Sequence, residues 1–241
     1  MSSQSDIETR QPAKKESLLL NLLLNIVIPT LILTKLSGDE YLGTRLALVV
    51  ALAFPLGYGL RDFISTRRVN VFSALGLISI LLTGGISLMQ LDPRYIAIKE
   101  AAIPGLIGLA TLISVKTPYP LVKVFLYNDK VLKIDKVVSA LRVRKMEAAM
   151  DNILRIASYL VATSFFVSSV LNYVLAKIVL VSPPGTVAYN EELGKMTALS
   201  YPVIVVPAMV VMAFTLFYLF RGIHKLTGLS FEEIINDGKS E

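Results

Sequence analysis

Four charged residues stand close together in an apolar part of the chain, and they are the residues most able to do chemistry. The stretch LLTGGISLMQLDPRYIAIKEAAIPG carries Asp92, Arg94, Lys99 and Glu100 between two hydrophobic runs. In a membrane such charges either anchor a helix end as an interfacial ion pair or mark a functional site. Both interpretations stay open from the sequence, and the four residues are candidates for an ion pair or a polar cavity.

The length of the next apolar run decides where Lys99 and Glu100 lie. Its uninterrupted apolar part is too short to cross a hydrocarbon core of ~30 Å. A span of residues 96–115 has the required length and places the pair about one turn inside the helix. Glu100 reaches water less easily than a lysine, so we expect it to face the bundle or a wet vestibule. Arg45 and Arg94 are further candidate partners for it.

Small and polar residues continue inward along one face of the helix that carries this pair, and similar stripes occur in three other apolar runs. Small residues let transmembrane helices approach closely, so packing alone explains most of these stripes. Asn25 and Asn172 exceed what packing requires. They are therefore candidates for lining a cavity.

Sequence motifs for catalysis are missing. The chain has no Cys and one His, and it contains no G-x-S-x-G, H-E-x-x-H, P-loop or G-x-G-x-x-G motif. The acidic residues are dispersed rather than clustered as a reaction would need. The sequence favours a protein that is not an enzyme, and it predicts no catalytic residue, metal site or cofactor.

The composition predicts the elements that must position these residues. Hydrophobic residues make up 54% of the 241-residue chain, charged residues 17%, and the mean hydropathy is +0.64. These values are typical of an integral membrane protein. The continuous apolar runs predict helices rather than the alternating strands of a barrel. We expect an all-α bundle with six transmembrane helices over residues 17–36, 42–60, 71–91, 96–115, 153–180 and 199–220.

The distribution of basic residues predicts the orientation. With the N-terminus inside, 18 of the 24 Lys and Arg residues lie on the cytoplasmic side. Both termini are therefore predicted to be cytoplasmic, with residues 1–16 a disordered tail and residues 221–241 a C-terminal tail. The net charge of +6 follows from this bias, so we expect no nucleic-acid partner.

Residues 116–152, between the fourth and fifth spans, form the one extended polar stretch of the chain interior. Its apolar residues recur at near-helical spacing, which predicts an amphipathic cytoplasmic helix at the membrane interface. Its cations either reflect the usual basic bias of cytoplasmic loops or form a surface for anionic lipids. The candidates for that surface are Lys130, Lys133, Lys136, Arg142, Arg144 and Lys145.

Three stretches resemble a known family. LTGGISLMQLDPRYIAIKEAAIPG is similar to the central signature of the bacterial intracellular septation protein A family, in which a glycine-rich helix end leads to an acid, an aromatic-Ile pair and a Lys. Here these positions are Gly84, Gly85, Ser87, Leu88, Asp92, Tyr95, Ile96 and Lys99. The stretches KTPYPLVKVFL and FFVSSVLNYVLA extend the likeness. It implies a small plasma (inner) membrane protein connected with envelope integrity and septation.

Two functions remain open from the sequence. The first is a non-enzymatic envelope protein that acts through contacts with membrane-protein partners or with further copies of itself, as the family likeness implies. The alternative is a transporter or lipid-handling protein with a polar cavity between helices near Glu100. In both, the lipid bilayer, including its anionic lipids, is the immediate surrounding of the chain.

Overall fold

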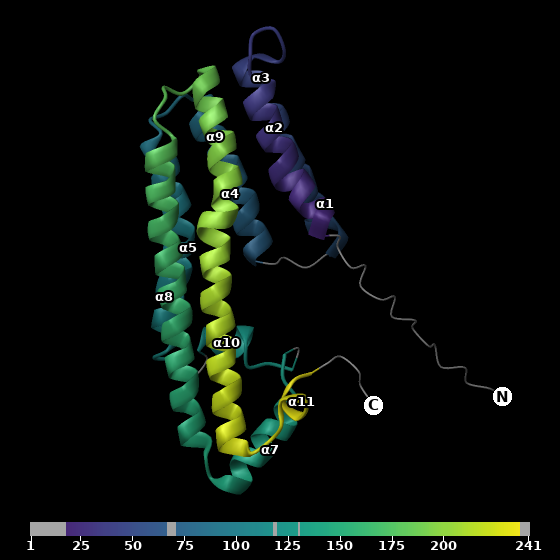
Figure 1. Cartoon of the computed structure of the whole chain (residues 1–241), viewed down its shortest axis with the longest axis vertical. Coiled ribbons are helices and arrows are strands. Elements are labelled where there is room, and N and C mark those ends of the chain that lie inside the picture. Colours follow the sequence, from purple (N-terminus) through teal and green to yellow (C-terminus); the bar gives the residue numbers. More distant parts are fainter. Residues whose placement is uncertain (1–17, 67–70, 118–119, 130, 237–241) are drawn as a thin grey trace, which may run out of the picture.

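The computed structural model describes residues 18–66, 71–117, 120–129 and 131–236. These residues form helices, and the single β feature among them is an isolated bridge between Leu132 and Ile235. Long helices run side by side, and the short helices α7 (Ile134–Arg144) and α11 (Phe231–Ile234) gather at one end (Figure 1). The prediction of an all-α chain is confirmed.

The helices follow the six predicted apolar runs in order. The first rod consists of α1 (Leu18–Leu22), η1 (Leu23–Val27) and α2 (Ile28–Lys35), and it is followed by α3 (Gly43–Thr66), α4 (Val71–Leu88) and α5 (Arg94–Ser114). The short helices α6 (Leu121–Phe125) and α7 (Ile134–Arg144) lead into α8 (Glu147–Val179). The last rod consists of α9 (Val187–Ser200), η2 (Tyr201–Val205) and α10 (Val206–Thr227), before α11 (Phe231–Ile234).

Within the part of the chain that the structure describes, four helical stretches are long and apolar enough to cross a membrane. They are Gly43–Arg61, Arg94–Ser114, Glu147–Val179 and Val187–Thr227. Two shorter apolar helices, Leu19–Lys35 and Ala74–Leu88, accompany them. In length and composition these four stretches therefore match membrane-spanning helices.

The last two rods are longer than the spans expected from hydropathy. Helix α8 has 33 residues and Val187–Thr227 has 41, which correspond to about 50 and 60 Å of helix. Hydropathy does not predict the extension of the last rod, because α9 contains polar residues. In the folded protein, other protein groups satisfy the hydrogen bonds of these residues. The Asn190 amide, which is 2% exposed, donates to Ser37 Oγ at 3.0 Å and to the Thr44 carbonyl at 2.8 Å.

A π-helical segment interrupts the first rod and another interrupts the last rod, each shortly before a proline. Segment η1 ends two residues before Pro29, and η2 ends two residues before Pro207. A proline ring clashes with the carbonyl four residues earlier, and a widened turn relieves that clash. The prolines thus explain both irregular segments.

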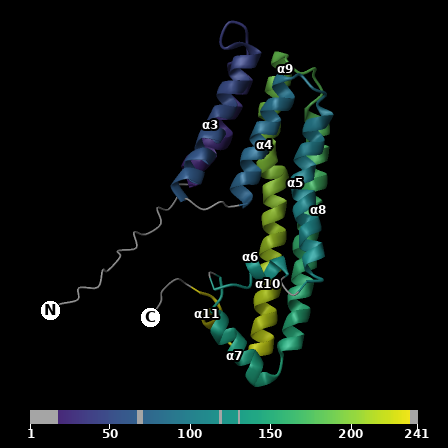
Figure 2. The same ribbon diagram turned by 180° about the vertical axis from the view of Figure 1, so that it is seen from behind.

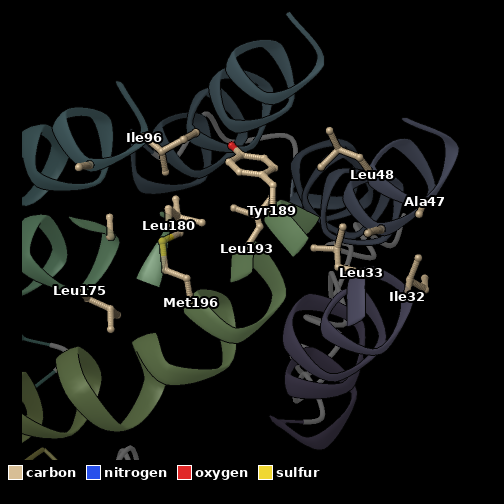
Figure 3. Close-up of a cluster of buried hydrophobic side chains, with 13 residues drawn as sticks. Ile32, Leu33, Ala47, Leu48, Ile96, Leu175, Leu180, Tyr189, Leu193 and Met196 are labelled. Carbon is tan, nitrogen blue, oxygen red and sulfur yellow. The ribbon is translucent and has the colours of Figure 1, made fainter. Parts of the chain in front are cut away.

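One hydrophobic core ties α2, α3, α5, α8 and α9 together near one end of the bundle. Tyr189 of α9 lies at its centre with no exposed surface, and its ring stands between Ile96 and Leu48 (Figure 3). The Tyr189 hydroxyl lies 2.9 Å from Ser87 Oγ of α4, so its polar atom is satisfied in an otherwise apolar setting.

A second hydrophobic core lies at the opposite end, where α8 and α10 continue to α7 and α11 (Figures 1 and 2). Val137 and Leu141 of α7 are buried in it, together with Ile234 of α11. The predicted amphipathic helix is thus present, but its apolar face packs on protein. This face is therefore not free to lie on lipid.

Helices α5 and α8 pair closely because small residues line their contact. A side chain at Gly108 would meet the Ala162 carbonyl at 3.3 Å and Phe165 Cβ at 3.1 Å. Further along the same contact, Ser169 Oγ donates to the Ala101 carbonyl at 2.7 Å. Close pairing of small residues is the usual basis of helix association in membranes. It also brings the Glu100 region of α5 against the middle of α8.

Candidate functional site at the Lys99 and Glu100 pair

Lys99 and Glu100 form an ion pair, but their environments differ. Lys99 Nζ lies 2.6 Å from Glu100 Oε1, and the two side chains are 6% and 27% exposed. The lysine is therefore enclosed by protein, whereas the carboxylate keeps an open side. Neighbouring residues on a helix point about 100° apart, which is why one position can be buried and the next one open.

The Lys99 ammonium points into α4 rather than back to water. Besides the carboxylate it contacts Thr83 Oγ1 at 2.6 Å, Ser79 Oγ at 3.1 Å and the Ser79 carbonyl at 3.3 Å. Ser79 and Thr83 are four residues apart and so lie on one face of α4. Four oxygens thus satisfy the three N–H donors of a buried ammonium, which lowers the cost of burying its charge.

Glu100 lines a groove of about 360 Å³ between α4, α5, α8 and η2. The polar lining residues come from three helices. They are Ser79, Glu100, Ser168 and Asn172, while Leu75, Gly76, Ile103, Pro104, Ile107, Phe165 and Ile204 complete the wall. Lys99 is not part of this lining. The groove therefore presents a carboxylate, with the matching positive charge behind it.

Asn172 of α8 adds an amide to the same groove. Its Nδ2 donates one N–H to the Ser168 carbonyl of its own helix at 2.8 Å, so the amide oxygen and the second N–H remain for a ligand. Of the cavity candidates in the sequence, Glu100 and Asn172 both line this groove. Lys99 is bonded to Glu100 but is buried outside the lining.

The other predicted members lie elsewhere. Arg94 pairs with Asp92 at 3.8 Å, and both side chains are more than half exposed. Arg45 is exposed on α3 and lines a small hollow with Asn190 rather than approaching Glu100. The Asn25 amide donates to the Asn21 carbonyl and side chain within its own helix.

The predicted basic surface divides into two parts. The Lys133 ammonium donates to the Glu232 carbonyl at 3.2 Å, and that of Lys136 lies 3.4 Å from Glu233 Oε1. The Ser230 backbone N–H and then Lys136 lower the pKa of the Glu233 carboxyl, so this contact is lost as the pH falls through that lowered value. The remaining cations are exposed; they are Arg142 and Arg144 in the last turn of α7 and Lys145 directly after it. Lys130 lies outside the described residues.

Comparisons of this chain with protein-family profiles, with curated proteins and with solved structures find no match. The residues of the site are therefore the basis of the proposed function.

Sequence reasoning did not assign Ser79 and Thr83 to the site. They belong to a stripe of small and polar residues in the third apolar run, a pattern that packing alone also produces. Their spacing of four residues, in the run that precedes the charged pair, was the available signal. It could not show that α4 turns this face toward Lys99.

Proposed function

We propose that this protein is an integral protein of the bacterial plasma membrane that handles an amphiphilic, lipid-like ligand at the groove beside Glu100. The observation that carries the proposal is the burial of Lys99 behind an open carboxylate. A carboxylate is costly inside a membrane, and an enclosed counter-ion offsets that cost without filling the groove. An ion pair that only anchored a helix end would not need this arrangement.

The groove favours a ligand head that donates hydrogen bonds. Its polar wall offers the Glu100 carboxylate and the Asn172 amide oxygen as acceptors, and the rest of its lining is mostly apolar. A lipid with a primary amine head matches both parts, because the amine donates N–H bonds and the acyl chains fit the apolar wall. A trimethylammonium head carries the same charge but has no donor.

The comparison of these two heads gives a direct test. Full-length protein in sealed vesicles is expected to speed the transbilayer movement of an acyl-labelled phosphatidylethanolamine by at least about tenfold over the phosphatidylcholine analogue. One lost charge-assisted hydrogen bond corresponds to a factor of about ten or more. The measurement is reduction of the exposed label by dithionite, with protein-free vesicles as control. Equal rates for both lipids would contradict the proposal.

We further propose six spans with both termini on the cytoplasmic side. The rod Leu18–Lys35 and helix α4 each cover 18 residues, about 27 Å, which approaches the thickness of a hydrocarbon core. Six is an even number, so the two ends of the chain fall on one side, and the bias of 18 of 24 basic residues favours the cytoplasm.

Cysteine labelling tests this topology cleanly because the chain has no Cys. Glu40 is exposed in the turn between α2 and α3, and Val143, in the last turn of α7, is 84% exposed. In intact spheroplasts, an impermeant maleimide is expected to label the Glu40→Cys variant and to leave Val143→Cys unlabelled until the cells are lysed. Labelling of both variants in sealed cells would refute the proposed arrangement.

A second candidate function is a contact protein of the cell envelope, as in the septation protein A-like family. The observation in its favour is that only 11% of the apolar window in Val187–Thr227 is buried, with Phe214 and Phe217 among the exposed residues. Membrane proteins or further copies of this chain could cover that face. Partners crosslinked in membranes and lost in a Phe214→Ala, Phe217→Ala variant would support it.

A further inference from the structure

A second hollow, distinct from the groove, lies where α5 ends. It also has a volume of about 360 Å³, and its walls come from the turn after α5, from α6 and from the first turns of α8. Its polar lining residues are Thr117, Lys123, Asp151, Asn152 and Arg155. Helix α6 lies crosswise at the level where α5 ends beside α8 (Figure 2).

Two cations from different helices meet at this pocket. Lys123 Nζ of α6 lies 3.6 Å from Asp151 Oδ1, and Arg155 Nη2 of α8 donates to Asn152 Oδ1 at 2.6 Å. An ammonium has three N–H donors and a guanidinium five, so these contacts leave most donors of both groups available. One carboxylate against two cations leaves the pocket with a formal charge of +1.

The pocket lies at the expected level of lipid headgroups. Helix α5 has 21 residues, about 32 Å, and so its two ends match the two faces of a ~30 Å hydrocarbon core. The pocket begins directly after Ser114, the last residue of α5. Val115 and Leu154 are apolar members of its lining, and Leu154 belongs to the second hydrophobic core.

We propose that this pocket binds a phosphate group, supplied either by an anionic lipid headgroup or by free inorganic phosphate. Arginine and lysine are the side chains that bind phosphate best, the first through several N–H groups and the second as a point charge. The pocket differs from the basic surface expected around Lys130 to Lys145. Arg155 stands eight residues, about 12 Å, along α8 from Glu147, the first residue of that helix.

Native mass spectrometry of the full-length protein in detergent tests the lipid source. The probes are dioleoyl phosphatidylglycerol and, as the neutral reference, dioleoyl phosphatidylcholine. The Lys123→Gln, Arg155→Gln double variant is expected to bind phosphatidylglycerol about 20-fold more weakly, since each well-placed cation contributes a factor of about five. The matched control is the Arg221→Gln, Lys225→Gln double variant. This control removes the same charge from exposed positions of α10 that do not line the pocket, and it is expected to keep the wild-type affinity.

The Asp151→Asn variant is expected to change phosphatidylglycerol binding in the opposite direction. A gain in binding cannot result from a folding defect, so this variant complements the double variant. Loss of the carboxylate that competes for Lys123 is expected to strengthen phosphatidylglycerol binding about fivefold. In a second arm, inorganic phosphate is titrated alone. Dependence of phosphate binding on Lys123 and Arg155, without lipid binding, supports the free ion as ligand. Equal losses in the pocket and control variants, or none in either, overturn the proposal.

Discussion

Replacing Glu100 by glutamine is expected to destabilise the folded protein by about 3 kcal/mol, whereas Lys99→Met is expected to cost only about 1 kcal/mol. The asymmetry follows from burial. Without Glu100, the Lys99 ammonium remains enclosed by α4 with neutral oxygens alone. Without Lys99, the carboxylate still has the open groove beside it, and methionine fills most of the space that the lysine occupied.

The two single variants and the double variant form a thermodynamic cycle. Thermal unfolding in detergent, followed by circular dichroism, is expected to give a melting temperature roughly 6–12 °C lower for Glu100→Gln, and a partial recovery when Lys99→Met is added. Ser182→Ala, in the turn after α8, provides a polar change at a side chain that bonds Glu192 rather than either member of the pair. If both single variants lose the same stability, the pair is equally exposed and the burial of Lys99 is not the cause.

The helical fold could be predicted from hydropathy because lipid forces each span to satisfy its own backbone hydrogen bonds. The residues at which the helices begin and end could not be predicted in this way. The α9 segment carries Asn190, Glu191 and Glu192, which a hydropathy window counts as loop. Only the folded structure shows that Asn190 is held by Ser37 and Thr44, and that Glu192 accepts from the backbone N–H groups of Val181 and Ser182.

The surroundings of the amphipathic helix α7 also could not be predicted from the sequence. Its spacing predicts a helix with one apolar face, and α7 has that face, but spacing does not say what covers it. The C-terminal segment supplies part of the cover. The Lys133 N–H donates to the Ile234 carbonyl at 2.8 Å, and the bridge between Leu132 and Ile235 holds the two segments together. This long-range pairing leaves no periodic signal in either segment.

The candidate site was partly predictable for a definite reason. The span length places Lys99 and Glu100 inside the helix, and a buried charge needs a partner, so a pair was expected from residues 96–115 alone. The direction of the lysine depends on how α4 is rotated against α5. That rotation is set by packing between the helices and by the turn at Met89 to Pro93, which the sequence does not reveal.

Asn172→Leu is expected to reduce the movement of labelled phosphatidylethanolamine about tenfold while leaving the melting temperature nearly unchanged. The Asn172 amide donates only within α8, so its loss breaks no contact between helices, yet it removes an acceptor from the groove. Leucine also fills part of the space beside Glu100. The measurement is the same vesicle assay, with unfolding in detergent followed in parallel.

Asn25→Leu is the matched control for this prediction, because the same change is made in another span. The Asn25 amide also donates within its own helix, but Asn25 is not part of the groove lining. Lipid movement in the Asn25 variant is therefore expected to equal that of the wild-type protein. If the two variants behave alike, the polar residues of these spans serve helix packing, and the groove beside Glu100 has no part in lipid handling. A loss confined to Asn172→Leu would instead tie lipid movement to the wall that Asn172 shares with Glu100, since helix stability is unaffected.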